Sequence, residues 1–288
     1  MRVTGGEQRM PLHIALAVAP GAPPSPSALA MRLCDIWRDR GHRISVTSAR
    51  FVEADCALLH IDTTVIKPEL VPETSPATLF LNRKVVDISK RRVSRNLVSP
   101  ADDYSGPVIV KTNGNYFGLN LTPENARHKL MRFLRKGAGP KTWRYLHMLP
   151  KTSYPILNRK SEVPDWVWRR DDLVVERFMA EKEDDLYILR LWMFLGKREY
   201  GVKLYGRQPV VKSDDLVRYE YLTEVPEELR RERERLGFDF GKFDYVLENG
   251  KAQLLDANST PTLHSDSKPS PNLLNLADAL SDMFEGRC

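Results

Sequence analysis

Three oxygen-bearing side chains near the end of the chain have the spacing of a metal-binding hairpin. Asp244 lies in the first of two strand-forming runs that flank Asn249-Gly250, and Asp256 and Asn258 lie at the end of the second. Asn-Gly tolerates the positive φ of a tight turn, so we predict a hairpin that places Asp244 and Asp256 nearly opposite one another. Asp256 and Asn258 are two residues apart and share a face. Carboxylate and amide oxygens suit a hard cation such as Mg²⁺.

A purely structural role is the alternative for this triplet. Asp and Asn next to Gly and Pro are common turn residues. The apolar context favours the metal, because Leu254-Leu255 leads straight into Asp256. A carboxylate at a buried strand end is costly unless it is paired or bound to a metal.

Two lysines upstream have the placement of phosphate ligands. Lys111 ends a β-branched run and is followed by a loop that contains Gly114 and Gly118. A lysine at a strand end can deliver its charge to phosphates, and a glycine-bearing loop can bring N–H groups over them. Lys90 lies in a basic segment that by itself indicates either a solvated helix face or an electrostatic patch.

These segments, in this order, resemble the ATP-grasp superfamily, above all its RimK-type amino-acid ligases and D-alanine–D-alanine ligases. The likeness rests on Lys242-x-Asp244 and Leu-Leu-Asp256-Ala-Asn258-Ser-Thr-Pro261, with the other parts at matching intervals over residues 80–264. It implies an α/β chain with the ATP-grasp fold, in which two α+β subdomains grip ATP, preceded by a small Rossmann-like domain. The expected units are a disordered leader at 1–10, the preceding domain at 11–87, and the ATP-grasp domain at 88–288, divided into subdomains at 88–176 and 177–288.

The resemblance also implies roles for individual residues. Asp244, Asp256 and Asn258 would hold Mg²⁺, with Mn²⁺ as an alternative ion. Arg190 and Lys242 would be catalytic, and Arg190 would face the phosphoryl-transfer site. Glu176 matches an adenine-side position, one of Glu181 and Glu183 would accept the ribose hydroxyls, and Lys203 is either a phosphate contact or a surface lysine. The full expected set of ATP contacts is Lys90, Lys111, Gly114, Gly118, Glu176, Arg177, Phe178, Glu181, Glu183 and Lys203.

Four further residues are candidates for binding the substrate. His60 and Asp62 close a strand-forming run, and ligands bind beyond the carboxyl ends of strands in open α/β sheets. Asp62 equally suits a capping or turn role. Thr260 and His264 would line the acceptor side of the ATP-grasp site.

The periodicity of the chain predicts the elements that position these residues. Alternating β and α patterns at the start imply a parallel sheet. We expect strands there at 12–18, 43–47, 54–61 and 77–81, with a helix at 26–40. Further along we expect helices at 124–135 and 226–236, a loop near the active-site mouth at 141–170, and an amphipathic closing helix at 272–284.

The composition and net charge of the chain limit the classes of partner that we expect. The 288 residues are 42% hydrophobic, enough for a sizeable core, and 44 basic against 38 acidic residues give a formal charge of +6. This mild excess suits an anionic ligand such as a nucleotide, and we expect no nucleic-acid partner. The three cysteines, Cys34, Cys56 and Cys288, show no CxxC pattern, which indicates free thiols in a reducing cytoplasm. No apolar run approaches the length of a membrane span, so no membrane partner is expected, and a homodimer is a candidate assembly.

The expected function is an ATP-dependent carboxylate–amine ligase that forms an acyl-phosphate from an amino acid or peptide and releases ADP and phosphate. Two alternatives stay open. One is an ATP-grasp kinase that phosphorylates a small-molecule alcohol, and the other is a non-catalytic ATP-binding regulatory protein. The metal site does not separate these three, whereas product analysis does.

Overall fold

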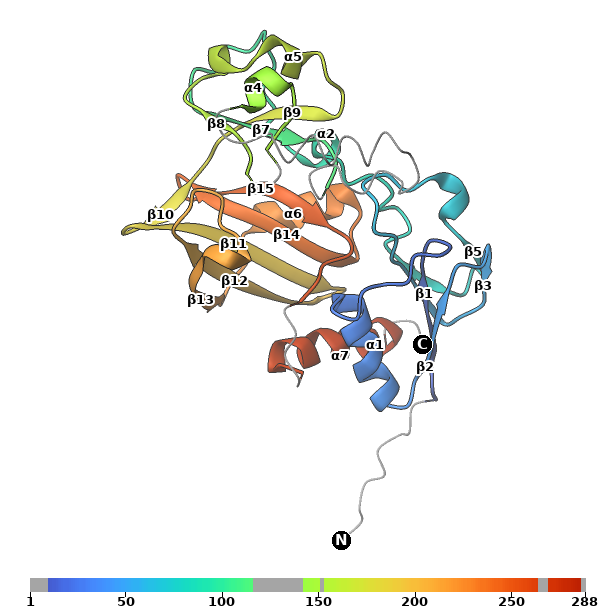
Figure 1. Ribbon diagram of the computed structural model, residues 1–288. Helices are drawn as coiled ribbons and strands as arrows, with labels where there is room; N and C mark the ends of the chain where they lie inside the picture. The colour runs from blue at the N-terminus through green and yellow to red at the C-terminus, as the bar shows by residue number, and fades with distance from the viewer. Residues whose placement is uncertain (1–9, 116–141, 151–152, 264–268, 286–288) are drawn as a thin grey trace.

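The computed structural model describes residues 10–115, 142–150, 153–263 and 269–285. These residues form a four-stranded sheet, a three-stranded sheet, a six-stranded sheet and a separate pair of short strands. Figure 1 shows the six-stranded sheet in the centre, the four-stranded sheet to its right and the three-stranded sheet above it. The predicted helix at 124–135, most of the leader, Gly118 and His264 lie outside the described residues.

The four-stranded sheet is parallel, as predicted. Its strands are β1 (His13–Ala17), β2 (Arg43–Thr47), β4 (Cys56–Leu59) and β6 (Leu79–Leu81), in the order β2-β1-β4-β6. Helix α1 (Leu29–Asp39) connects β1 to β2. The connection from β4 to β6 contains a 3-10 turn and a short strand instead of an α-helix, so Rossmann-like architecture stays a prediction. The elements of that connection are η1 (Pro68–Leu70) and β5 (Glu73–Thr74). Strand β5 pairs with β3 (Phe51–Val52), which lies between β2 and β4 in the chain.

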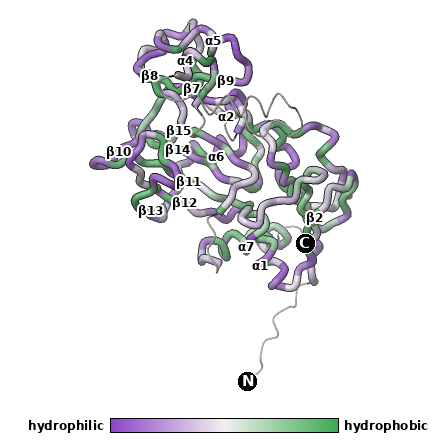
Figure 2. Tube along the Cα trace, viewed as in Figure 1, coloured by the Kyte–Doolittle hydropathy of each residue, from purple (hydrophilic) through white to green (hydrophobic). Residues whose placement is uncertain are grey.

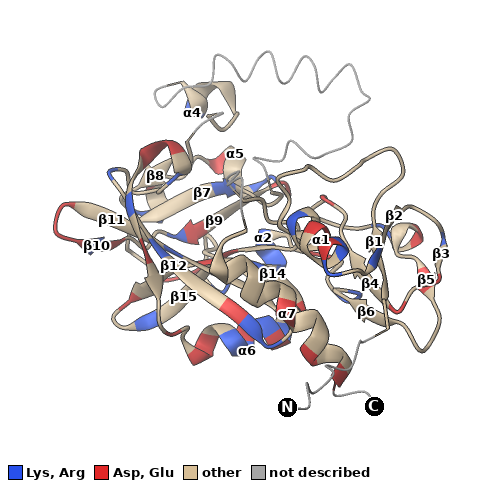
Figure 3. Ribbon diagram, turned by 90° about the horizontal axis from the view of Figure 1, so that it is seen from below, with Lys and Arg blue, Asp and Glu red and all other residues tan. Residues whose placement is uncertain are grey.

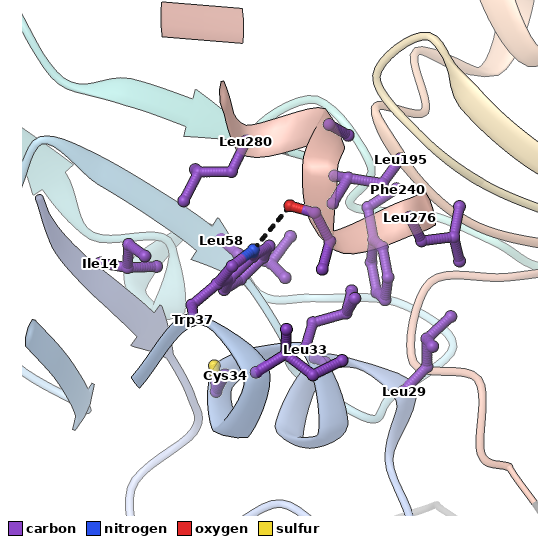
Figure 4. Close-up of a cluster of buried hydrophobic side chains, with 14 of the residues drawn as sticks. Ile14, Leu29, Leu33, Cys34, Trp37, Leu58, Leu195, Phe240, Leu276 and Leu280 are labelled. Carbon is purple, nitrogen blue, oxygen red and sulfur yellow. Dashed lines mark hydrogen bonds between the residues drawn. The ribbon is translucent and has the colours of Figure 1, made fainter. Parts of the chain in front are cut away.

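One hydrophobic core joins this sheet to the six-stranded sheet. Leu33 and Trp37 of α1 pack against the closing helix α7 (Pro271–Glu285), and Phe240 of the larger sheet fills the space between them (Figure 4). The Trp37 indole Nε1 donates a hydrogen bond of 2.9 Å to the carbonyl of Ala277. Each large side chain buried in this way contributes about 1.5–3 kcal/mol relative to exposure. The core therefore fixes the position of one sheet relative to the other.

The six-stranded sheet is antiparallel and carries different contacts on its two faces. One face packs on α6 through Trp192, Phe194 and Phe243, whose ring centroids lie 4.5–5.6 Å apart. The other face of the sheet packs on α7 at one end of the sheet, through Met193 and Leu195. The elements are β10 (Glu181–Glu183), β11 (Leu186–Leu195), β12 (Arg198–Gly206), η5 (Ser213–Asp215), β13 (Leu216–Leu222), α6 (Glu227–Leu236), β14 (Phe240–Glu248) and β15 (Lys251–Asn258).

Charge and hydropathy follow this arrangement. Strand β10 is hydrophilic along its length and lies at the outer end of the sheet (Figure 2). Helix α6 (Glu227–Leu236) alternates basic and acidic residues along its length (Figure 3), a pattern typical of a helix that borders solvent. No helix in the described part of the chain is both long enough and apolar enough to cross a membrane.

The three-stranded sheet sits above β15, in the order β8-β7-β9. The described part of the stretch at 141–170 packs into its core, where Trp143 and Val167 are buried, and so differs from the expected loop. The reason is aromatic burial, because Trp143 makes an edge contact with Trp166 at a centroid distance of 5.9 Å. The elements of this unit are β7 (Val108–Thr112), α4 (Trp143–Leu146), β8 (Ile156–Leu157), η4 (Lys160–Glu162), α5 (Asp165–Trp168) and β9 (Leu173–Arg177), and the short helix α2 (Lys90–Val93) precedes it.

Candidate nucleotide and metal site

The predicted hairpin is present and brings the two aspartates together. Asn249 and Gly250 both have positive φ, 51° and 77°, and form the turn between β14 and β15. Asp244 is directly opposite Asp256, and Lys242 is directly opposite Asn258, so all four side chains lie on one face of the sheet. The register shifts just beyond Asp244, a β-bulge of the kind that often re-aims a side chain near a site.

Asp244 is an acceptor that the protein leaves incompletely bonded. Its Oδ1 is shielded from solvent and has no hydrogen-bond partner among the described residues. The Lys242 Nζ lies 2.9 Å from that oxygen as an ion pair, and its hydrogen bond goes to Oδ2 at 3.3 Å. Burial raises the pKa of Asp244, Lys242 opposes this effect and the charge of Asp256 adds to it. A cation between Asp244 and Asp256 would relieve both the burial and the repulsion.

Lys90 reaches this pair from α2. Its Nζ forms an ion pair with Asp256 and donates a hydrogen bond of 3.1 Å to the Oδ1 of Asn115. The side chain is buried, and burial alone would lower the pKa of Lys90. The Asp256 carboxylate outweighs that effect and holds the pKa of Lys90 above its usual value, so the lysine is charged.

Lys111 and Glu176 form a second buried pair in the three-stranded sheet. Their Nζ and Oε2 atoms lie 2.6 Å apart. Glu176 is 2% exposed, and its Oε1 has no hydrogen-bond partner in the part of the chain that the structure describes. The Thr112 hydroxyl bonds to the carbonyl of Gly114 at 2.8 Å, which fixes the start of the predicted glycine-bearing loop. The charge of Glu176 also influences Lys90, which places both lysines in one electrostatic environment.

Asn258 connects the hairpin to the parallel sheet. Its Oδ1 accepts a hydrogen bond of 2.8 Å from the backbone N–H of Thr260. The Thr260 hydroxyl donates to Asp62 at 3.0 Å, so two of the predicted substrate residues lie beside the predicted metal ligands. His60 closes β4 as a buried residue with an unbonded Nδ1 among the described atoms, and burial lowers its pKa to about 4.

Arg190 and Lys203 lie on the other face of the sheet. The register pairs Arg190 with Lys203 and with Tyr245, whereas the neighbouring Leu191 is opposite Asp244. The structure therefore does not bring Arg190 to the face that carries the predicted metal ligands, and its catalytic role stays a prediction. The cause is strand alternation, because adjacent residues on β11 point to opposite faces.

On that face, each of the two glutamates that were candidates for binding the ribose forms an ion pair with a basic side chain. Glu181 accepts bonds of 2.6, 2.9 and 3.1 Å from Arg190 and a fourth, of 2.8 Å, from the backbone N–H of Leu247. Glu183 lies 2.5 Å from the Lys203 Nζ. Both pairs link β10 to the body of the sheet.

The last residue of β9 and the first residue after it have backbone amides that are already bonded. The N–H of Arg177 donates to the carbonyl of Asn96 and that of Phe178 to the carbonyl of Pro107, at 2.8 and 2.9 Å. The Arg177 guanidinium lies 4.9 Å from the ring centre of Tyr104. An adenine ring at this segment would therefore need amides beyond Phe178.

The residues of the hairpin fit a magnesium ion. No cluster of three or more His, Cys, Asp and Glu side chains suited to a metal occurs in the described ranges. Mg²⁺ does not require one, because it commonly takes one or two carboxylates and completes its shell with phosphates and water. The incompletely bonded Oδ1 of Asp244, opposite Asp256 and beside the amide oxygen of Asn258, supplies such a donor set.

Comparisons with known proteins agree with this architecture. No protein-family model matches the sequence, and no curated protein matches it at a significant level. Solved structures do match over nearly the whole chain, and they show that the chain has the ATP-grasp fold. At the identities found, the likeness shows the fold alone.

Three of these structures illustrate the likeness. The ATP-grasp ligase PsnB, complexed with a phosphomimetic variant of its minimal precursor, Mg and ADP, is 10% identical, with a TM-score of 0.51 over 95% of this chain and 98% of that one. The macrocyclase MdnC, bound with precursor peptide MdnA from Microcystis aeruginosa MRC, is 7% identical, with a TM-score of 0.50 over 95% and 99%. A RimK domain ATP-grasp protein from Sphaerobacter thermophilus DSM 20745 is 13% identical, with a TM-score of 0.47 over 95% and 100%.

Two neighbours of Lys90 were missed by sequence reasoning. Asn115 accepts its hydrogen bond, and the Tyr154 hydroxyl lies close enough for its pKa to respond to Lys90 and Asp256, although burial is the main reason that this pKa is raised. Asn115 follows Gly114 in the glycine-bearing loop, which was a usable signal. Nothing in the sequence near Tyr154 indicates that it approaches α2.

Proposed function

We propose that the protein is an ATP-dependent carboxylate–amine ligase that acts through an acyl-phosphate. The observation that carries the proposal is the pair Asp244–Asp256 on one face of the hairpin, with one buried lysine, Lys90, and one half-buried lysine, Lys242, each paired to one of the two carboxylates. In this proposal the triphosphate of ATP, together with Mg²⁺, would bind at this group of two negative and two positive charges.

Asp244, Asp256 and Asn258 are the residues that would hold Mg²⁺, which when bound supplies positive charge to neutralise phosphate oxygens. Lys90 and Lys111 would exchange their carboxylate partners for phosphate oxygens. Phosphoryl transfer depends mainly on positioning and on charge neutralisation, so these residues supply most of what the protein must contribute.

The reaction has two steps in this proposal. An oxygen of the substrate carboxylate attacks the γ-phosphorus of ATP, and the bond from that phosphorus to the bridging oxygen breaks, so that ADP leaves with the electron pair. An amine nitrogen then attacks the acyl carbon, the carbon–oxygen bond to phosphate breaks, and the nitrogen loses a proton to solvent. Lys242 is the residue we assign to the charge that develops on the transferred group.

Arg190 and Lys203 have a different role in the proposal from the one the sequence resemblance implied. Their ion pairs with Glu181 and Glu183 hold β10 against β11 and β14. We therefore assign them to positioning the segment that would carry the ribose contacts.

An amino acid or peptide is the substrate class we propose. Support comes from two of the structures above, since MdnC is bound with a precursor peptide and PsnB is complexed with a variant of its minimal precursor. In the present chain Asp62 and Thr260 lie next to the hairpin and would line the acceptor side.

Thermal melting tests the nucleotide site first. Binding at about 100 times Kd adds about 2.7 kcal/mol to the free energy of unfolding, which is a clear rise in Tm. We expect that rise with ATP plus Mg²⁺ and not with ATP plus EDTA. No rise with any nucleotide would contradict the proposal.

Product analysis then separates a ligase from a kinase. Candidate acids are screened for ADP release with and without an amine, and the products are identified by mass spectrometry. A ligase consumes the amine and forms an amide. Formation of a stable phosphate ester without amine consumption would instead identify a kinase.

A further inference from the structure

Strand β13 (Leu216–Leu222) forms an outer edge of the six-stranded sheet. It pairs with β12 on one side, and no strand in the described part of the chain pairs with its other side (Figure 1). Six of its seven residues are exposed. An edge strand of this length presents a row of backbone N–H and C=O groups that can template pairing with another strand.

The side chains of β13 are unusually apolar for an exposed edge. Tyr219 and Tyr221 are 57% and 55% exposed and share one face of the strand. Val217, which is 41% exposed, lies at the register shift between Arg218 and Leu216. The ring centroids of Tyr219 and Tyr221 lie 5.8 Å apart, and Tyr221 also meets Tyr200 at 6.4 Å, so the rings form a continuous aromatic stripe. The strand contains neither proline nor lysine, two residues that commonly protect edges.

The sequence of β13, Leu-Val-Arg-Tyr-Glu-Tyr-Leu, is complementary to itself about Tyr219. In an antiparallel pair centred on Tyr219, Arg218 is opposite Glu220 of the partner subunit, and Tyr219 is opposite Tyr219 of the partner subunit. Opposite charges and aromatic or aliphatic residues directly across an antiparallel pair are stabilising. Centring the pair on Arg218 or on Glu220 would instead bring two like charges face to face. The charge pattern thus favours the Tyr219 register over these two neighbouring registers.

We propose that β13 is a dimerisation strand, which pairs antiparallel with β13 of a second copy of this chain about a two-fold axis at Tyr219. A two-fold interface requires one surface that is complementary to itself, and this strand meets that requirement. Arg218 and Glu220 already form an ion pair within one subunit, so pairing would extend two charges into a ring of four. The two six-stranded sheets become continuous, and the faces that carry Asp244 lie on the same side of the joined sheet.

Sedimentation velocity of the full chain tests the dimer. We expect a concentration-dependent change from monomer to dimer between about 1 and 100 µM, the range in which small interfaces assemble. Tyr219→Lys and Tyr219→Glu each place like charges at the two-fold axis, so each variant alone should have a dimer Kd at least about tenfold higher. An equimolar mixture of the two variants should form a heterodimer, because the charges at the axis are then opposite.

The mixture separates a direct contact from damage to the fold, since two misfolded variants would not rescue one another. Tyr145→Lys is the matched control, because Tyr145 is an aromatic residue that is 85% exposed on α4, far from β13 in the sequence. It should leave the dimer unchanged. A wild-type protein that stays monomeric, a dimer that persists in Tyr219→Lys, or a mixture that fails to associate would each overturn the proposal.

Discussion

Lys90 on α2 and Asp256 on β15 form an ion pair although 166 residues separate them in the sequence. The predicted phosphate ligand and the predicted metal ligand therefore neutralise one another's charge. A phosphate alone would approach the Asp256 carboxylate, and a metal ion alone would leave a buried Lys90 without its partner. We infer that the nucleotide and the metal replace this ion pair together.

Asp256→Asn tests that relationship without removing the side chain that holds Lys90. The amide keeps an acceptor oxygen for Lys90 but loses the charge that a metal needs. Turnover measured as ADP release should fall by about 10²–10³-fold, the size of effect expected when a charge-stabilising group is lost. The buried Lys90 also loses the charge of its partner, so the melting temperature without ligands should fall, and ADP release is compared at a temperature at which the variant is folded.

Glu248→Gln is the matched control for this variant. Glu248 ends β14 as an exposed residue of the same hairpin, so it removes one carboxylate without touching the site. Near-normal activity in Asp256→Asn, or an equal loss in Glu248→Gln, would contradict the assignment.

Lys111 and Glu176 provide a prediction about stability. Lys111→Met leaves the buried Glu176 carboxylate without its cation, which should lower the free energy of unfolding by about 3–5 kcal/mol. Adding Glu176→Gln removes the stranded charge and should recover much of the loss. Urea denaturation of both single variants and the double variant gives the coupling energy. Purely additive losses would mean that the two side chains do not interact.

The reactivity of the buried cysteine thiols should show whether the core that joins the two sheets is closed to solvent. Cys34 and Cys56 are buried, and burial raises the pKa of the Cys34 thiol to about 12, so little thiolate forms at neutral pH. In a Cys288→Ser variant we expect no fast reaction with a thiol reagent at pH 8, and two reactive thiols after unfolding. A rapidly labelled thiol in the native variant would show that the core around α1 is open.

The elements that the sequence predicted well are those set by local chemistry. Asn249-Gly250 determines a turn by its own backbone preferences, and a correct turn is enough to bring Asp244 opposite Asp256. The parallel strands around α1 were similarly visible as apolar runs. Their identification needed no knowledge of distant contacts.

The face of Arg190 could not be predicted in this way. Alternation shows that Arg190 and Leu191 point in opposite directions, but it does not show which of them shares a face with Asp244. That depends on the register between β11 and β14, which places Leu191 opposite Asp244. The packing of Trp192 and Phe243 against α6 selects the register, and such contacts between distant residues leave no mark on either strand alone.

His60 leads to a prediction about pH. Burial lowers its pKa from about 6.5 in the unfolded chain to about 4 in the folded protein, so the unfolded chain takes up the proton first as the pH falls. Neutral His60 therefore makes its full contribution to the free energy of unfolding above about pH 6.5. That contribution is lost as the pH falls toward about 4, and the loss is about 2 kcal/mol at pH 5. Urea denaturation at pH 7 and pH 5 measures this loss, and His60→Gln should reduce it by that amount, while all other groups titrate equally in both proteins. An identical loss in the variant would contradict the prediction. It would mean that His60 takes up a proton in the folded protein as readily as in the unfolded chain.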